Sequence, residues 1–157
     1  MSGRDWRLFG RLHAKLYKRL GGRFVGSLGL GRKVLLLTTI GRRSGKARTT
    51  PLIYMPHGDQ LIVYPSNGGK ESPPAWWLNL QTTPEATIQI GRQSSPVRAR
   101  AATGVEYDGL WPKAADYNPH WRDYERTVRR SIPLVVLERI DVQGRMGGRE
   151  TGFDSGG

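Results

Sequence analysis

The sequence contains no cysteine, and no long apolar run occurs anywhere in its 157 residues. Without cysteine there is no disulfide, no thiolate nucleophile, and no cysteine-ligated zinc or iron–sulfur site. A membrane-spanning helix would need about 18 consecutive apolar residues, and a secretory signal would need an apolar segment behind the N-terminus. The sequence has neither feature, so we expect a cytoplasmic protein.

Histidine is also scarce, and its three copies, His13, His57 and His120, stand far apart in the sequence. None belongs to an H-x-x-x-H pair or to a carboxylate cluster, so we expect no metal site. No serine has the G-x-S-x-G context of a hydrolase nucleophile, which argues against a hydrolytic triad. With so little side-chain chemistry available, an enzyme with this sequence would need a bound organic cofactor to supply the reaction.

Acidic residues are scarce in the first third of the chain, where residues 1–50 contain 13 Lys or Arg and a single acid, Asp5. Residues 51–157 contain 12 basic and 12 acidic residues, so the whole net charge of +12 lies in the first third. Such an asymmetry points to an anionic partner for that part of the chain. Nucleic acid, anionic lipid and a polyanionic cofactor all satisfy the charge pattern.

Residues 5–20 have the pattern of a basic amphipathic helix, which the pair Gly21-Gly22 ends. Apolar residues recur every three or four positions from Trp6 to Leu20, and basic residues recur half a turn away. One interpretation is a surface helix packed on the domain. The other is a helix that lies on an anionic membrane surface with its tryptophan and phenylalanine facing the lipid.

Five or six short strands, most of them joined by hairpins, follow further along the chain, with helices inserted late. The predicted strands are 34–40, 49–55, 60–64, 86–90, 95–102 and 134–140, and the predicted helices are 75–80, 104–115 and 120–130. This order favours a mainly β fold with helices (α+β), built as an antiparallel sheet or small barrel. Pro51 inside the second strand predicts an edge position or a break in the ladder. The chain then divides into a basic amphipathic N-terminal helix (1–22), a folded domain (23–140) and a flexible, glycine-rich C-terminal tail (141–157).

The turn at residues 41–48 gathers four cations and a hydroxyl between two predicted strands, with glycine at both ends of its tight part. Glycine lets the backbone approach a ligand closely, successive amide groups form an anion nest, and guanidinium groups bind phosphate in a bidentate manner. It is not a Walker A loop, because Ala47 stands where a serine or threonine would hold magnesium. We interpret the turn as an anion site, with a solvated basic hairpin as the alternative. Its candidate residues are Arg42, Arg43, Ser44, Gly45, Lys46 and Arg48.

Three further segments carry side chains suited to a ligand. The first follows a strand and offers a hydroxyl, an amide and flexible backbone, and the second is a tryptophan pair on a short helix. Adjacent tryptophans cannot both face the core, so one of them can line a pocket for a flat ring. The third is an aromatic segment near the last predicted helix. Their residues are Ser66, Asn67 and Gly68, then Trp76, Trp77 and Asn79, then Tyr117, Trp121 and Tyr124.

Taken in order, these segments resemble the deazaflavin-dependent nitroreductase and quinone reductase family, whose members use reduced coenzyme F420. The resemblance covers roughly residues 11–139. It rests on Leu35–Gly45, Arg48, Pro51-Leu52, Ser66–Gly69, Trp76-x-x-Asn79-Leu80 and Ser131–Val136. It implies a split β-barrel of the FMN-binding, flavin-reductase-like type. It also implies hydride transfer from C5 of the reduced deazaflavin (F420H2) to a quinone, a nitro compound or another electrophile.

The resemblance further implies a role for each segment. The basic turn, Arg42 to Arg48, would hold the phosphate and glutamyl tail of F420. Around the deazaflavin ring and its linker would lie Pro51, Leu52, Ser66, Asn67, Gly68, Trp76 and Asn79. On the acceptor side would lie Tyr117, Trp121 and Tyr124, where better-known nitroreductases carry a Tyr-Pro-x-Tyr-x-x-Tyr motif. Here Asn118 precedes the proline and Trp121 replaces the middle tyrosine, so the substrate choice departs from that pattern.

Two classes of function are therefore weighed. The preferred one is an F420H2-dependent reductase, docked on the inner face of an anionic membrane through residues 1–20, because quinones dissolve in lipid. The alternative is a non-catalytic basic module that binds nucleic acid or an anionic membrane surface. No aromatic residues alternate with the bases of the 42–48 turn, so nucleic acid is not expected as a partner. A variant of the first class keeps the barrel but binds FMN or haem.

Overall fold

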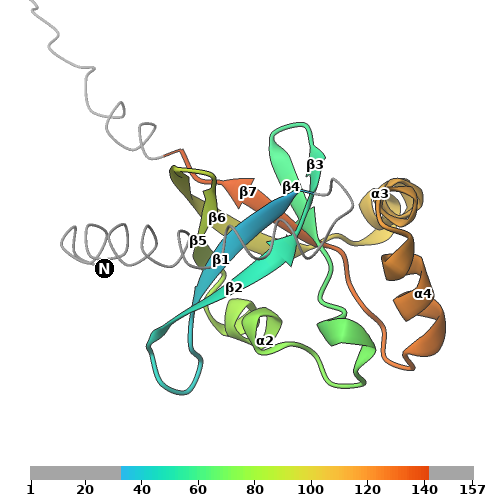
Figure 1. Cartoon of the computed structure of the whole chain (residues 1–157), viewed down its shortest axis with the longest axis horizontal. Coiled ribbons are helices and arrows are strands. Elements are labelled where there is room, and N and C mark those ends of the chain that lie inside the picture. Colours follow the sequence, from blue (N-terminus) through green and yellow to red (C-terminus); the bar gives the residue numbers. More distant parts are fainter. Residues whose placement is uncertain (1–32, 142–157) are drawn as a thin grey trace, which may run out of the picture.

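The computed structural model describes residues 33–141, which form one seven-stranded sheet with helices on its faces (Figure 1). The strands are β1 (Val34–Ile40), β2 (Ala47–Ile53), β3 (Met55–His57), β4 (Gln60–Val63), β5 (Glu85–Ile90), β6 (Gln93–Ala101) and β7 (Val135–Arg139). The helices are the short 3-10 turn η1 (Asn67–Gly69), α2 (Ala75–Thr82), α3 (Gly104–Tyr117) and α4 (Pro119–Thr127). The helix predicted over 5–20 and almost all of the tail predicted over 141–157 lie outside the described residues.

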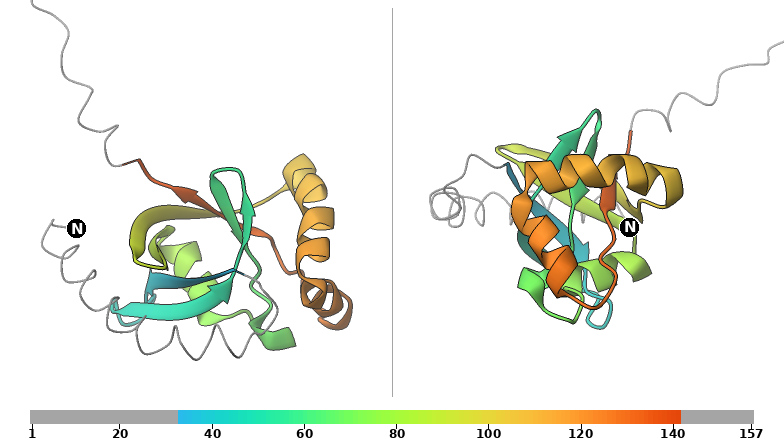
Figure 2. Two further views of the ribbon diagram at one scale, coloured as in Figure 1. Left: turned by 45° about the horizontal axis from the view of Figure 1, so that its top comes forward. Right: turned by 90° about the vertical axis from the view of Figure 1, so that its right-hand side faces the viewer.

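The sheet is antiparallel, and its strand order is β2-β1-β5-β6-β7-β4-β3. β2 and β3 thus stand at opposite edges, although Tyr54 alone separates them in the chain. In a flat sheet, six spacings of about 4.8 Å would part these edges by roughly 29 Å, which one residue cannot span. The sheet therefore curls into a half-barrel (Figure 2), and the split-barrel fold class predicted from the sequence is confirmed.

The first hydrophobic core lies inside the curl. Leu35 and Leu37 of β1 are fully buried there together with Ile88 of β5, and α2 adds Trp76 and Leu80. The spacing of two residues between Leu35 and Leu37 is the period that places side chains on the same face of a strand. Helix α2 is therefore fixed against the sheet by its apolar residues, and its polar residues are held close to the β1–β2 turn.

The second hydrophobic core lies between the sheet and the helix pair α3–α4, which stands on one side of the half-barrel (Figure 1). Ile62 of β4 and Val136 of β7 are fully buried, and they pack with Leu110 and Ala114 of α3 and Trp121 of α4. None of the described helices is long and apolar enough to cross a membrane.

Two of the predicted elements needed correction. The strand predicted over 49–55 is two strands, because β2 ends at Ile53 and β3 begins at Met55 on the opposite edge of the sheet. The helix predicted to run to residue 130 ends at Thr127, since Val128 already has an extended backbone (φ −91°, ψ 132°). Pro51 lies on β2, an edge strand, as predicted from its missing N–H.

Candidate functional site

The turn between β1 and β2 is shaped by its two glycines. Gly41 N–H donates to the Lys46 carbonyl at 2.7 Å, and Gly45 N–H donates to the Gly41 carbonyl at 2.8 Å. Gly45 has a φ of 67°, in the left-handed region that glycine adopts without steric cost. At Gly41 an added Cβ atom would lie 2.6 Å from Ser44 Oγ. Gly45 therefore provides the left-handed residue of the turn, and a side chain at Gly41 would require Ser44 Oγ to move.

Asn79 of α2 ties the turn to the rest of the domain. Its Oδ1 accepts a hydrogen bond from Arg42 N–H at 3.1 Å, and its Nδ2 donates to Thr39 Oγ1 at 3.1 Å. Asn79 and Thr39 are both buried. Because the oxygen and the nitrogen of its amide each have a protein partner, Asn79 braces the turn against α2. The resemblance implied a place around the ring and linker of the cofactor, and the structure puts Asn79 beside the turn.

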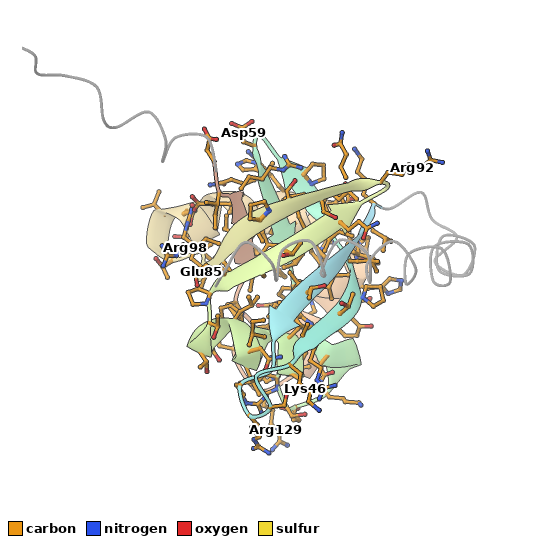
Figure 3. All side chains as sticks on the ribbon, turned by 90° about the vertical axis from the view of Figure 1, so that its left-hand side faces the viewer. Lys46, Asp59, Glu85, Arg92, Arg98 and Arg129 are labelled. Atoms are coloured by element: carbon orange, nitrogen blue, oxygen red, sulfur yellow. The ribbon has the colours of Figure 1, made fainter. Side chains whose placement is uncertain are left out.

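The turn and the start of β2 present positive charge without compensation. Their four cations are all exposed, and none of them forms an ion pair with a carboxylate of residues 33–141; they are Arg42, Arg43, Lys46 and Arg48. The amide N–H groups of Arg43 and Ser44 also donate no hydrogen bond within the described part of the chain. Figure 3 shows Lys46 at the opposite end of the molecule from Asp59. Guanidinium, ammonium and amide donors gathered in this way suit an anionic ligand.

Pro51 and Leu52 lie further along β2, on the same edge of the sheet. Both are half-buried, and Leu52 packs against the first core. Their partners across the β1–β2 ladder are Leu36 and Leu35. They therefore form an apolar continuation of the edge strand whose other end carries the exposed cations.

Ser66, Asn67 and Gly68 lie in the loop between β4 and α2. Asn67 and Gly68 have left-handed φ values of 50° and 63°, and Gly69 follows at 83°. The Asn67 amide Nδ2 donates to the Ser72 carbonyl at 2.9 Å, which holds the side chain against its own loop. Ser66 and Asn67 are half-buried and Gly68 is exposed, so the loop presents short polar groups and backbone at the surface.

The two tryptophans of α2 take different environments, as their adjacency predicted. Trp76 is buried in the first core with 6% of its surface exposed, whereas Trp77 is half-buried at the margin of that core. From the family resemblance, Trp76 was predicted to lie near the cofactor. In the structure Trp77 is the more accessible of the pair, and the sequence pattern alone did not distinguish them.

The three acceptor-side residues named from the sequence come together in the second core. Trp121 is 5% exposed, and its ring centroid lies 6.3 Å from that of Tyr117. The Tyr117 hydroxyl accepts a hydrogen bond from Lys33 N–H at 3.2 Å, which leaves its own proton available to another acceptor. Tyr124 is half-buried at the margin of the same cluster.

Tyr64 also joins this cluster; it begins the predicted polar segment that contains Ser66, Asn67 and Gly68, but it was not among the predicted site residues. Its ring centroid lies 5.6 Å from that of Trp111 and 5.5 Å from that of Trp121. Its hydroxyl is buried and has no hydrogen-bond partner among the described residues. Burial, with smaller contributions from Tyr107 and Glu125, raises the pKa of Tyr64 above its usual value. Tyr64 ends the apolar run of the strand predicted over 60–64, and that pattern predicts only a buried position in the core.

The predicted site residues lie along one side of the molecule. In Figure 1 the β1–β2 turn and the η1 loop are well separated, α2 lies between them, and α4 stands beyond η1. Such a spread suits an elongated ligand with a charged end and a flat end. Within residues 33–141 no group of three or more histidine, aspartate or glutamate side chains could hold a metal ion.

Comparisons with known proteins agree with this geometry. The family model described as F420H(2)-dependent quinone reductase matches residues 8–139. An F420H(2)-dependent quinone reductase of Mycobacterium tuberculosis is 32% identical over 132 residues, which cover 82% of this chain and 89% of the relative. A solved structure described as an F420-H2 dependent reductase (FDR-A) has a TM-score of 0.62 at 30% identity, covering 68% of this chain and 95% of that chain. Another, described as a domain-swapped dimer, has a TM-score of 0.63 at 27% identity and covers 80% of this chain and 99% of that one.

Proposed function

The chain belongs to the F420H(2)-dependent quinone reductase family, and on this premise we propose that its basic turn and its η1 loop together hold reduced coenzyme F420. The protein is thus an oxidoreductase that uses F420H2, and the enzyme interpretation is confirmed over the non-catalytic binding module. Nothing in the family or in its named members points to FMN or haem.

The observation that carries the proposal is the uncompensated charge of the β1–β2 turn. Coenzyme F420 has a phosphodiester and several carboxylates in its arm, so it needs several cations at one place. Among residues 33–141, the four exposed cations of the turn have no ion pair and two of its amide groups have no acceptor. The brace from Asn79 to Arg42 holds part of this arrangement in place before a ligand arrives. Preorganised donors bind an anion at a lower entropic cost.

We assign the flat end of the cofactor to the neighbouring segments. Pro51 and Leu52 supply an apolar edge, and Trp77 supplies a half-buried ring beside the core. Ser66, Asn67 and Gly68 supply the short polar groups that a ring with exocyclic oxygens requires, and Trp76 and Asn79 support the site from behind.

When bound, F420H2 supplies a hydride from C5. The chain's own part is to orient the acceptor, to exclude water and to deliver the proton that a reduced quinone takes up. The proposed donors are Tyr124, half-buried beside the η1 loop, and Tyr117, whose hydroxyl oxygen accepts from Lys33 N–H and can still donate to a further acceptor. Trp121 is buried and has only an indole N–H, so its role is to form the wall behind them. The nitro acceptors implied by the resemblance stay a prediction.

The test compares the double substitution Arg42→Ala with Arg43→Ala against Arg92→Ala. Arg92 is an exposed arginine in the β5–β6 turn, at the other end of the molecule from Lys46 (Figure 3). Each lost charge-assisted hydrogen bond weakens binding by about 1.5–3 kcal/mol, so the double variant should bind F420 at least about 100-fold more weakly. Fluorescence titration measures the affinity, and menadione reduction measures turnover. Equal affinities of the double variant and the control would refute the proposal.

We also propose that residues 1–20 bring the enzyme to an anionic membrane. These residues lie outside the described part of the chain, and the support is their basic amphipathic sequence pattern. Deletion of residues 1–20 should reduce binding to vesicles that contain anionic lipid, with little change in the turnover of a water-soluble quinone. Undiminished vesicle binding by the truncated protein would exclude this docking role.

A further inference from the structure

Arg130 reaches from the segment between α4 and β7 to the loop that follows β4. Its Nη2 donates to the carbonyl oxygens of Pro65 at 3.0 Å and Ser66 at 3.1 Å, and its Nε donates to the carbonyl of Lys70 at 3.2 Å. One guanidinium therefore binds the backbone at both ends of the η1 loop. Its acceptors are all main-chain carbonyls, so its contact with the loop does not depend on a carboxylate.

The loop that Arg130 holds has an unusual backbone. Asn67, Gly68 and Gly69 have successive φ values of 50°, 63° and 83°. Gly68 and Gly69 adopt these angles without steric cost, whereas Asn67 is a non-glycine residue in the left-handed region. Fixing two flexible glycines and one strained residue in a single conformation has a free-energy cost that contacts to the loop must offset. Inside the loop, the Asn67 side chain bonds to the Ser72 carbonyl. The guanidinium of Arg130 constrains the loop from outside through three hydrogen bonds.

Two further contacts connect the same loop to α4 and to the segment behind it. The Glu71 carboxylate accepts the backbone N–H of Arg129, with oxygen distances of 3.2 and 3.3 Å. At Gly69 an added Cβ atom would lie 3.1 Å from the Tyr124 ring, so the ring of α4 sits directly against the loop. The loop, Tyr124 and the 128–130 segment therefore form one packed unit.

We propose that Arg130 is a positioning residue, which holds the Ser66–Gly68 loop in its cofactor-binding conformation and keeps that loop in register with Tyr124 on α4. The inference rests on the proposed function, because it takes Ser66–Gly68 as part of the F420 site. Arg130 acts through the backbone of the loop and is not itself a cofactor ligand. A lysine at this position has one ammonium group and cannot reproduce a planar fork that reaches three carbonyls.

The experiment compares Arg130→Gln and Arg130→Lys with the control Arg126→Gln in the full chain. Arg126 is exposed in the last turn of α4, and its guanidinium makes no hydrogen bond or ion pair with the described residues. We expect both Arg130 variants to bind F420 about 10-fold to 100-fold more weakly, with the control within twofold of the parent. The KM for menadione should rise as well, because Tyr124 loses its fixed position beside the loop.

Two additional readouts separate positioning from general stability and from direct charge contact. Hydrogen exchange should become faster for the amides of residues 66–70, while the amides of β1 and β5 keep their protection. The affinity ratio between Arg130→Gln and the parent should be the same at low and high salt, whereas a lost ionic contact would give a ratio that shrinks with salt.

Parent-like affinity in both Arg130 variants would overturn the inference. A salt-dependent loss, or faster exchange throughout the sheet, would overturn it too. Failure of the proposed function has a different signature, since the Arg42/Arg43 double variant would then bind F420 as tightly as the parent. If the double variant loses binding and the Arg130 variants keep it, only the role of Arg130 is wrong.

Discussion

Replacing Asn79 with alanine should weaken both the fold and the anion site, because one amide serves both. Its Nδ2 bonds to Thr39, whose side chain is fully buried, and its Oδ1 bonds to the Arg42 amide in the basic turn. Alanine leaves the Thr39 hydroxyl without this partner in the interior. It also releases the first residue of the turn from α2.

The magnitude follows from these two bonds. Each of the two hydrogen bonds contributes about 1 kcal/mol to stability, so the loss is about 2 kcal/mol. For a chain of this size that corresponds to a decrease in Tm of about 5 °C. Without the hydrogen bond to Asn79, the turn is less well preorganised, and we expect the binding free energy of F420 to weaken by roughly 1 kcal/mol. This corresponds to about a fivefold loss of affinity.

The assay pairs thermal unfolding with F420 titration on Asn79→Ala and on Gln81→Ala. Gln81 is an exposed residue on the same helix, so its variant controls for the change in helix propensity. Lower affinity with an unchanged Tm would refute the brace and would instead place the Asn79 amide in direct contact with the cofactor. An unchanged Tm and an unchanged affinity would refute any role for these two hydrogen bonds.

Two further predictions concern the Tyr64 hydroxyl and the ion pair between Arg100 and Glu106. Tyr64→Phe removes a buried hydroxyl that has no partner among the described residues, so we expect a gain of about 1 kcal/mol and a Tm higher by about 3 °C; a lower Tm would show that the hydroxyl is bonded. The hydrogen bond from Arg100 lowers the pKa of Glu106 in the folded state. The ionised carboxylate therefore stabilises the fold fully above the unfolded-state pKa, and this stabilisation is lost as the pH falls through the folded-state pKa. Because the pair is largely exposed, we expect its loss to lower the free energy of unfolding by at most about 0.5 kcal/mol between about pH 6 and pH 3, as measured by urea unfolding. The Glu106→Gln variant should lack this part of the acid destabilisation, and an equal loss in that variant would contradict the assignment.

The β1–β2 hairpin with its basic turn could be predicted because its signals are local. Gly41 and Gly45 mark the turn, an apolar run precedes it, and the cations stand between the two strands. The brace from Asn79 was beyond such reasoning. Asn79 lies 37 residues from Arg42 and 40 residues from Thr39, and its partners there are a backbone amide and a hydroxyl. Nothing in the sequence pattern indicates that Asn79 would bond to this amide or to this hydroxyl.

The division of the second predicted strand was missed for a related reason. The apolar and β-branched residues continue across Tyr54 without a turn residue, so the local pattern is that of one strand. What separates β2 from β3 is the curl of the whole sheet, which places them on opposite edges. The sheet is completed by β7, which lies far along the chain and pairs with β6 on one side and β4 on the other. This pairing puts β3 at the edge opposite to β2.

The arginines of this chain show why a net charge predicts a partner and does not identify the residues that bind it. Arg100 bonds to the carboxylates of Glu106 and Glu138, Arg130 bonds to backbone carbonyls, and Arg42 has neither kind of acceptor for its guanidinium among residues 33–141. These three environments arise from partners up to 65 residues away in sequence, so composition treats all three as equal. Charge that remains uncompensated after folding attracts an anion, whereas a guanidinium already bonded to the protein holds its neighbours in place. Neutralising Arg42 should therefore weaken F420 affinity by a factor that shrinks as the ionic strength rises, whereas neutralising Arg130 should weaken it by changing the shape of a loop.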